Sequence, residues 1–106
     1  MSMFEERQKG MEQKFRMDEE LAFRLTSRRN RLFGRWAADA LGLSGAAAED
    51  YATAVIHADL QAPGDDDILA KVDQDFRAAA VPRTRAELRQ TLDRCAAEAR
   101  AQMADR

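Results

Sequence analysis

Four arginines spaced at intervals of 4, 3 and 4 residues are the most prominent chemical pattern of the chain: Arg24, Arg28, Arg31 and Arg35. On a helix this spacing places all four guanidinium groups along one stripe. Such a stripe could dock an acidic partner or contact the phosphates of an anionic ligand or nucleic acid. The other interpretation, which we favour, is a solvated helix face partly paired with the aspartates of 65–67, 73 and 75.

Other side chains that could react are few. His57 is the only histidine, and one histidine gives no metal-ligand pattern and has no catalytic partner at a readable spacing. Cys95 is expected on an inner helix face as a buried, inert thiol. The aspartates of 65–67 lack the alternating ligands of a calcium loop, so we interpret Asp65 or Asp66 as a helix cap. We therefore expect no enzyme activity, no metal and no cofactor.

Composition narrows the class of protein further. The chain has 106 residues and a net charge of −2, which divides into +2 for residues 1–43, −6 for 44–80 and +2 for 81–106. A negative net charge without a basic recognition helix argues against binding to nucleic acid. A single cysteine rules out an intrachain disulfide and suits a reducing cytoplasm. The sequence has neither an apolar signal segment nor the roughly 20 apolar residues of a membrane span, so we expect no membrane insertion.

Helical periodicity runs through most of the chain, and no alternating strand pattern is present. With 21 alanines, five glycines and two prolines, the composition favours helix. We predict helices over about 18–41, 44–60 and 66–80, and a fourth from residue 84. The expected fold class is all-α, a small four-helix bundle. Its inward positions are predicted to be Leu21, Leu25, Leu32, Trp36, Ala40 and Leu43; Tyr51, Val55, Ile56 and Leu60; Ile68, Leu69, Val72 and Phe76; and Leu88, Leu92, Cys95, Ala99 and Met103.

The helix ends carry recognisable signals. Asp18 is a plausible N-cap for the first helix, and Gly42 is expected at its left-handed C-terminal position. Ser44 has the side chain of an N-cap, and Val81-Pro82 should stop the third helix. The sequence Thr-Arg-Ala-Glu at 84–87 predicts a capping box. Gly34, in mid-helix, is expected where a neighbouring backbone comes close.

Residues 1–17 differ from the rest of the chain. Their apolar side chains Phe4, Met11 and Phe15 are spaced 7 and 4 residues apart, so on a helix they would share one stripe among charged neighbours. Gly10 interrupts this stripe and costs about 1 kcal/mol relative to alanine. We predict a mobile amphipathic arm over 1–17 that becomes helical against a partner, followed by a four-helix bundle over 18–106.

Two stretches carry a resemblance to a known family. The segments DEELAFR (18–24) and RRNRLFGRWAADALGLSG (28–45) are similar to the zeta-subunit family of alphaproteobacterial ATP synthase inhibitors. The family shows an acidic opening, an arginine-arginine-asparagine run, and a glycine-x-tryptophan-alanine-alanine core closed by glycine-leucine. The matching residues are Asp18, Glu19, Leu21, Phe23, Arg28, Arg29, Asn30, Leu32, Gly34, Trp36, Ala37, Ala38, Gly42 and Leu43. Residues 51–75 resemble the family's second and third helices.

The resemblance implies an inhibitor that binds the catalytic head of the F-type ATP synthase and blocks ATP hydrolysis. It implies that the N-terminal arm inserts at a catalytic interface of the alpha and beta subunits, near the central stalk, and that the protein is cytoplasmic and peripheral to the inner membrane. Gly10 and Met11 depart from the family pattern, which implies weaker inhibition. The partner-binding residues are then Phe4, Glu5, Glu6, Arg7, Met11, Glu12, Lys14 and Phe15.

Two other functions stay open. The stripe of Arg24, Arg28, Arg31 and Arg35 could be a secondary docking surface, or could bind an adenine nucleotide or another anion. Nucleic-acid binding by the same arginines is the third possibility, and it would be steeply dependent on salt. We expect the free protein to be a monomer.

Overall fold

Four α-helices form the fold: α1 (Met3–Ala40), α2 (Gly45–Asp59), α3 (Asp66–Ala78) and α4 (Arg85–Ala104). The computed structural model describes residues 3–59 and 64–104, and the side chains of 18–58 and 64–104. α1 contacts α2 and α4, while α3 contacts α2 and α4. The predicted all-α four-helix bundle is confirmed, and all four helices lie close to their predicted ranges except at the start of α1.

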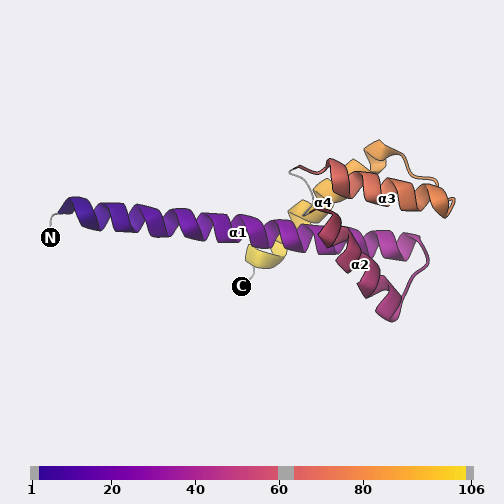
Figure 1. The fold of residues 1–106 in the computed structure, drawn as a ribbon, viewed down its shortest axis with the longest axis horizontal. Coiled ribbons are helices and arrows are strands. Elements are labelled where there is room, and N and C mark those ends of the chain that lie inside the picture. The colour runs from indigo at the N-terminus through magenta and orange to yellow at the C-terminus, as the bar shows by residue number, and fades with distance from the viewer. Residues whose placement is uncertain (1–2, 60–63, 105–106) are drawn as a thin grey trace.

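α1 is much longer than the other helices. It has 38 residues, so it spans about 57 Å at 1.5 Å per residue. Figure 1 shows that its C-terminal half lies among α2, α3 and α4, whereas its N-terminal half projects beyond them. Because α1 begins at Met3, Asp18 lies inside this helix and is not its N-cap. The mobility predicted for residues 1–17 stays a prediction.

The core lies where the four helices meet. Phe33 and Ala37 of α1, Val55 of α2, the buried face of α3 and the inner face of α4 form one apolar cluster. All four residues predicted to face inward on α3 are buried. Of the five predicted on α4, four are buried, and Met103 is half-buried. Leu60 lies outside the described residues.

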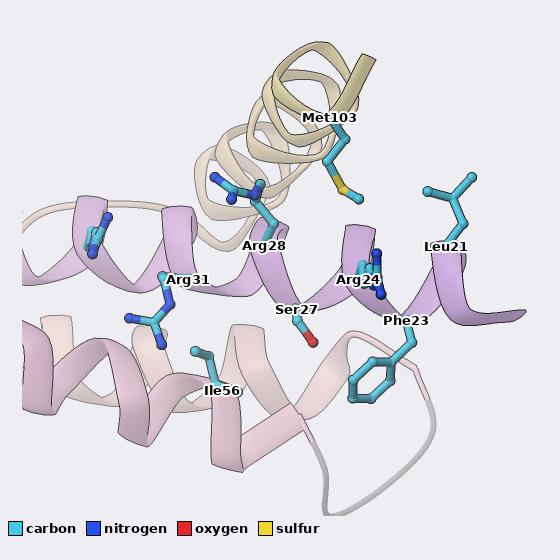
Figure 2. Close-up of a pocket in the computed structure, with 9 residues that line it drawn as sticks. Leu21, Phe23, Arg24, Ser27, Arg28, Arg31, Ile56 and Met103 are labelled. Carbon is cyan, nitrogen blue, oxygen red and sulfur yellow. The ribbon is translucent and has the colours of Figure 1, made fainter. Parts of the chain in front are cut away.

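α1 and α2 approach closely at Gly34. A methyl group built on Gly34 would lie 2.8 Å from the Cα of Ala52 in α2. A real side-chain carbon does not approach backbone that closely, so only glycine fits without movement of a helix. The prediction that a neighbouring backbone comes close to Gly34 is confirmed. Figure 2 shows α1 lying between α2 and α4 in a close view.

The ends of α1 and α3 have the same hydrogen-bond geometry. At the end of α1, Gly42 has a φ of +80° and the Leu43 amide donates to the Ala38 carbonyl over 2.9 Å. This pattern is a Schellman motif, and it confirms Gly42 at the left-handed position. α3 ends in the same way, two residues earlier than predicted, but its left-handed residue is Ala80, with a φ of +58°.

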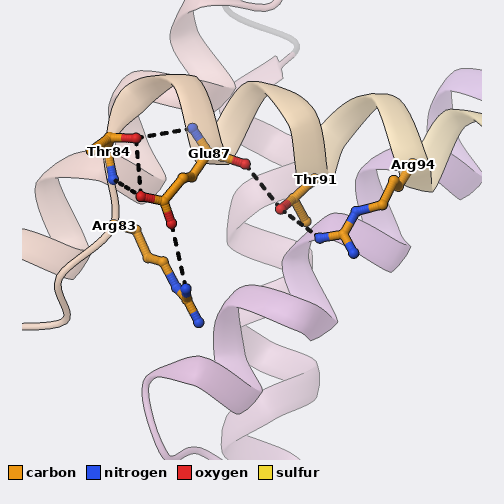
Figure 3. A network of polar contacts seen from close by, with 5 residues as sticks. All are labelled: Arg83, Thr84, Glu87, Thr91 and Arg94. Carbon is orange, nitrogen blue, oxygen red and sulfur yellow. Dashed lines mark hydrogen bonds and ion pairs between the residues drawn. The ribbon is translucent and has the colours of Figure 1, made fainter.

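α4 begins with the predicted capping box. The Glu87 amide donates to the Thr84 hydroxyl over 3.1 Å, and the Thr84 amide donates back to a carboxylate oxygen of Glu87 over 3.4 Å (Figure 3). Arg83 donates to the other carboxylate oxygen. The hydrogen bond from the Thr84 amide is the largest cause that lowers the pKa of Glu87 below its ordinary value, followed by the Thr84 hydroxyl. The first turn of α4 therefore has its own polar network.

Candidate functional site

Partner binding was predicted for eight side chains of the first 17 residues: Phe4, Glu5, Glu6, Arg7, Met11, Glu12, Lys14 and Phe15. Their side chains lie outside the described ones, so their roles stay predictions. The backbone that carries them is the N-terminal part of α1, which projects from the bundle in Figure 1. The structure therefore gives this segment a helical backbone continuous with the helix that enters the core.

The four arginines of the stripe lie in a row on α1, and three of them have partners. Arg31 and Arg35 share the carboxylate of Glu49 in α2, at 3.3 and 3.0 Å. Arg28 donates to the side-chain oxygen of Gln102 in α4 over 2.9 Å. For Arg24, no partner is present among the side chains that the structure describes. The stripe is therefore satisfied toward its C-terminal end and open toward the N-terminal arm.

The predicted pairing of this stripe with the aspartates of α3 is wrong. Asp65 pairs instead with Arg29, one position along α1, at 3.0 Å, and with Arg89 of α4 at 2.9 Å. Asp65 does occupy the N-cap position of α3, but its side chain makes no capping hydrogen bond. The reason is that its carboxylate is taken by the two arginines, so it ties three helices together rather than capping one.

The stripe forms part of an open groove of about 960 Å³. α1 supplies most of its lining, while Ile56 comes from α2 and Met103 from α4 (Figure 2). Two large apolar side chains are exposed at its N-terminal end, Leu21 by 48 % and Phe23 by 66 %. We call this the α1 groove, and its lining residues are Leu21, Phe23, Arg24, Ser27, Arg28, Arg31, Arg35, Ile56 and Met103.

The core face of α1 differs from the predicted one at its N-terminal end. Leu21 was predicted to face inward, but it is exposed. Phe33, which lies beside the predicted apolar stripe, is fully buried. Trp36 is partly buried and packs against the core, with its ring 5.8 Å from that of Phe33 and 5.7 Å from that of Phe76. The other helices surround α1 around Phe33 and beyond, and they leave the turn at Leu21 uncovered.

A polar network between α2 and α3 was not predicted from the sequence. The Tyr51 hydroxyl donates to Asp75 over 2.8 Å, and Lys71 lies 3.0 Å from the same carboxylate oxygen. Burial raises the pKa of Tyr51 well above its ordinary value, and the hydrogen bond to Asp75 raises it further. Tyr51 is therefore a neutral donor that fixes α2 to α3. A tyrosine in one helix with an aspartate 24 residues later gives no signal in the sequence.

The histidine and the cysteine do not form a reactive pair. His57 is exposed, in a shallow depression between α2 and α3 that Lys71 also lines. Cys95 is buried on the inner face of α4, and burial raises its pKa, which keeps the thiol in its unreactive protonated form. Among the residues that the structure describes, no group of three His, Cys, Asp or Glu side chains could hold a metal ion. In the same residues, no helix is both long and apolar enough to cross a membrane.

These features define a small helical protein whose prominent surfaces suit docking: a projecting helix and, at its base, a basic and apolar groove. The comparison with family models then identifies the family. The chain belongs to the family of the ATPase inhibitor subunit zeta, whose model matches residues 1–102. The chain is therefore assigned to a family of inhibitor subunits, which is a regulatory class of protein.

A solved structure supports the fold. The chain is similar to a protein whose solution NMR structure shares 38 % sequence identity and superposes with a TM-score of 0.70. The match covers 78 % of this chain and 94 % of that chain. A comparison with curated proteins gave no match. The solved structure thus supports the fold described here.

Proposed function

We propose that this protein inhibits ATP hydrolysis by the F-type ATP synthase of its own cell by inserting residues 1–17 into the catalytic head. The insertion site would be a catalytic interface between alpha and beta subunits, close to the central stalk. A helix wedged there would stop rotation in the direction of hydrolysis. The observation that carries the proposal is the projection of α1 beyond a bundle that belongs to an inhibitor family.

The length of the projecting segment suits insertion. The helical backbone of residues 3–17 reaches about 22 Å, because each residue adds about 1.5 Å. The C-terminal half of the same helix is anchored in the core by Phe33 and Ala37, which are fully buried. A long helix anchored at one end can carry its free end deep into a crevice while the bundle stays outside.

The composition of the segment suits a helix-in-groove mode. Phe4, Met11 and Phe15 would be its apolar anchors. Glu5, Glu6, Arg7, Glu12 and Lys14 would set orientation and register through complementary charges. Gly10 weakens the helix of this segment by about 1 kcal/mol, and any part of it that orders only on binding lowers the affinity, which makes the complex releasable.

The proposal includes the partners and the location. The partners would be the alpha, beta and central-stalk subunits of the catalytic head, with neither nucleic acid nor lipid contacted directly. The free protein would be a cytoplasmic monomer, held at the inner membrane only through the synthase. It would have no catalytic activity of its own.

The test is ATP hydrolysis by the purified cognate synthase, titrated with full-length protein and with a variant that lacks residues 1–17. We expect full-length protein to inhibit and the shortened variant to have lost inhibition. Circular dichroism of the shortened variant is the control, since the bundle should remain folded. Hydrolysis that is unaffected by saturating full-length protein would refute the proposal.

A small helical binder of adenine nucleotide or another anion is the second candidate. The observation that favours it is the row of arginines beside the exposed ring of Phe23 in the α1 groove. It ranks second because Glu49 already neutralises Arg31 and Arg35 in part. Titration of labelled protein with ATP, followed by amide chemical shifts, would support it if the shifts gathered along residues 24–35.

A further inference from the structure

We propose that the α1 groove binds an acidic, amphipathic helix on the outside of the catalytic head, as a second contact separate from the N-terminal arm. This proposal rests on the proposed function, since it assigns a further part of the same partner. The groove begins at Leu21, immediately after the segment that would be inserted. When residues 1–17 are inserted, the groove would therefore lie against the surface of the catalytic head around the insertion point.

The positive charge of the groove favours an acidic binding partner. Four arginines line it, and none of the lining residues that the structure describes is acidic. Glu49 lies beside it and pairs with two of these arginines, so the positive charge is only partly balanced. Glu19 and Glu20 lie near Arg24 in the adjoining depression, but neither forms an ion pair with it among the described contacts. An acidic surface would find Arg24 with no partner to displace among the described side chains.

The apolar side chains in the groove favour a binding partner that is amphipathic. Leu21 and Phe23 are the large hydrophobic side chains that the described residues leave exposed, and both line the groove. Ile56 of α2 and Met103 of α4 add apolar surface on its two sides (Figure 2). Exposed aromatic and aliphatic side chains gathered in one groove are typical of a binding site. A wholly polar acidic segment would leave them in water.

The length of the groove suits a helix as the binding partner. From Leu21 to Arg35 the lining of α1 covers about 21 Å, or four helical turns. Its arginines recur at intervals of 4, 3 and 4, so acidic residues at similar intervals on a helix lying along α1 would meet them in turn. The same register would place apolar residues of the partner against Phe23 and Met103.

The chain's own N-terminal arm does not fit this groove. Residues 1–17 contain three acidic and four basic side chains, so the arm has a net charge of +1 and would be repelled. Its backbone from Met3 also continues α1 directly, so it runs away from the groove and does not fold back over it. The arm is therefore not the occupant, and we assign the groove to a helix of the partner.

Two substitutions in the full-length protein test the groove. Phe23→Ala removes the more exposed of the two large apolar side chains in the groove. Arg24→Glu reverses the charge of the one groove arginine for which the structure describes no partner. Binding to the purified cognate catalytic head is measured at low and at moderate salt. We expect Phe23→Ala to raise Kd about tenfold at both, as for an aromatic hot spot. Arg24→Glu should raise Kd about tenfold at low salt and much less at moderate salt, where the charge is screened.

The control is Arg77→Glu, the same reversal at a side chain that is 80 % exposed on α3. It should stay within about twofold of the wild-type Kd, because salt-screened surface charges away from an interface contribute little. Inhibition at saturation should be unchanged in all three variants, since the arm is intact. If the wild type binds and inhibits, and Phe23→Ala and Arg24→Glu bind as it does, the groove proposal is wrong while the proposed function stands.

A second measurement tests whether the groove binds an acidic helix even if the wild-type protein does not bind the catalytic head. Labelled full-length protein is titrated with a synthetic helical peptide that has glutamates on one face and leucines on the other. Amide shifts confined to residues 21–35 and the neighbourhoods of Ile56 and Met103 would support the groove, provided that a lysine version of the peptide gives none. Absent shifts would overturn the proposal. Shifts there with ATP but not with the peptide would make the occupant a nucleotide, and would overturn it as well.

Discussion

Phe23 and Phe33 stand ten residues apart on the same helix in opposite surroundings. Phe33 is fully buried and stacks against Trp36, whereas Phe23 is 66 % exposed beside the arginines of the α1 groove. Backbone hydrogen bonding is the same at both positions, since both lie inside α1. What differs is the presence of α2, α3 and α4 around the later turns. A helix can therefore continue beyond the core that stabilises it and present the same type of side chain to a partner.

The comparison predicts a large difference between two identical substitutions. Phe33→Ala should lower the free energy of unfolding by about 3–5 kcal/mol, because it leaves a cavity in the core. Phe23→Ala should change it by less than about 0.5 kcal/mol, as expected for an exposed position. Urea unfolding followed by circular dichroism measures both. Similar losses for the two variants would show that the turn at Phe23 is packed in solution.

The second prediction concerns the close approach of α1 and α2. Gly34→Ala should lower the free energy of unfolding by about 1–3 kcal/mol, because the new methyl group overlaps the backbone of Ala52. Helix propensity alone predicts the opposite, a gain of about 1 kcal/mol. Thr26→Ala, at an exposed position of α1, is the control and should be neutral or slightly stabilising. A Gly34→Ala variant more stable than wild type would mean that the two helices are farther apart than described.

The third prediction concerns the end of α3. Ala80 has a φ of +58°, a conformation that costs a residue with a side chain about 1–2 kcal/mol. Ala80→Gly should therefore raise the free energy of unfolding by about 0.5–1 kcal/mol, after the greater freedom of glycine in the unfolded chain is subtracted. Ala78→Gly, two residues earlier and inside the helix, should lower it by a similar amount. Thermal unfolding should show shifts of opposite sign, and shifts of the same sign would contradict the left-handed end.

The smallest effect is expected at the start of α4. The pKa of Glu87 is lowered in the folded protein, so its contribution to stability is present above the ordinary glutamate pKa of about 4.3. That contribution is lost as pH falls through the lowered folded value. Wild type should therefore be slightly more stable than Glu87→Gln near neutral pH, and the difference should shrink in acid. A difference that stays constant with pH would show that the carboxylate charge has no part in the capping network of Figure 3.

Much of the fold could be predicted because its signals are local. Gly42, the Thr84–Glu87 capping box and the buried face of α3 each follow from residues within one or two turns. Gly34 was also predictable, since glycine in mid-helix is costly unless something requires it. Such features depend on backbone geometry that neighbouring residues determine, so they can be predicted from a short stretch of sequence.

The site was less predictable because it depends on which helices reach which turn. Periodicity placed Leu21 on an apolar stripe. It does not show at which turn the other helices stop packing against this stripe and leave it exposed to solvent. The arginine stripe was predicted to pair with aspartates of 65–75, but its Arg31 and Arg35 pair with Glu49 of α2. Asp65 pairs instead with Arg29, which lies outside the stripe. Long-range pairs such as Tyr51 with Asp75 leave no trace in sequence spacing.

α1 is divided between an anchored half that stabilises the bundle and a projecting half to which we assign inhibition. The most direct measurement is ATP hydrolysis by the cognate synthase, titrated with the double variant Phe4→Ala, Phe15→Ala, whose thermal unfolding is recorded in the same sample. We predict a large loss of inhibition with an unfolding midpoint like that of the wild type. Full inhibition by this variant, or a loss of inhibition matched by loss of the folded bundle, would contradict it.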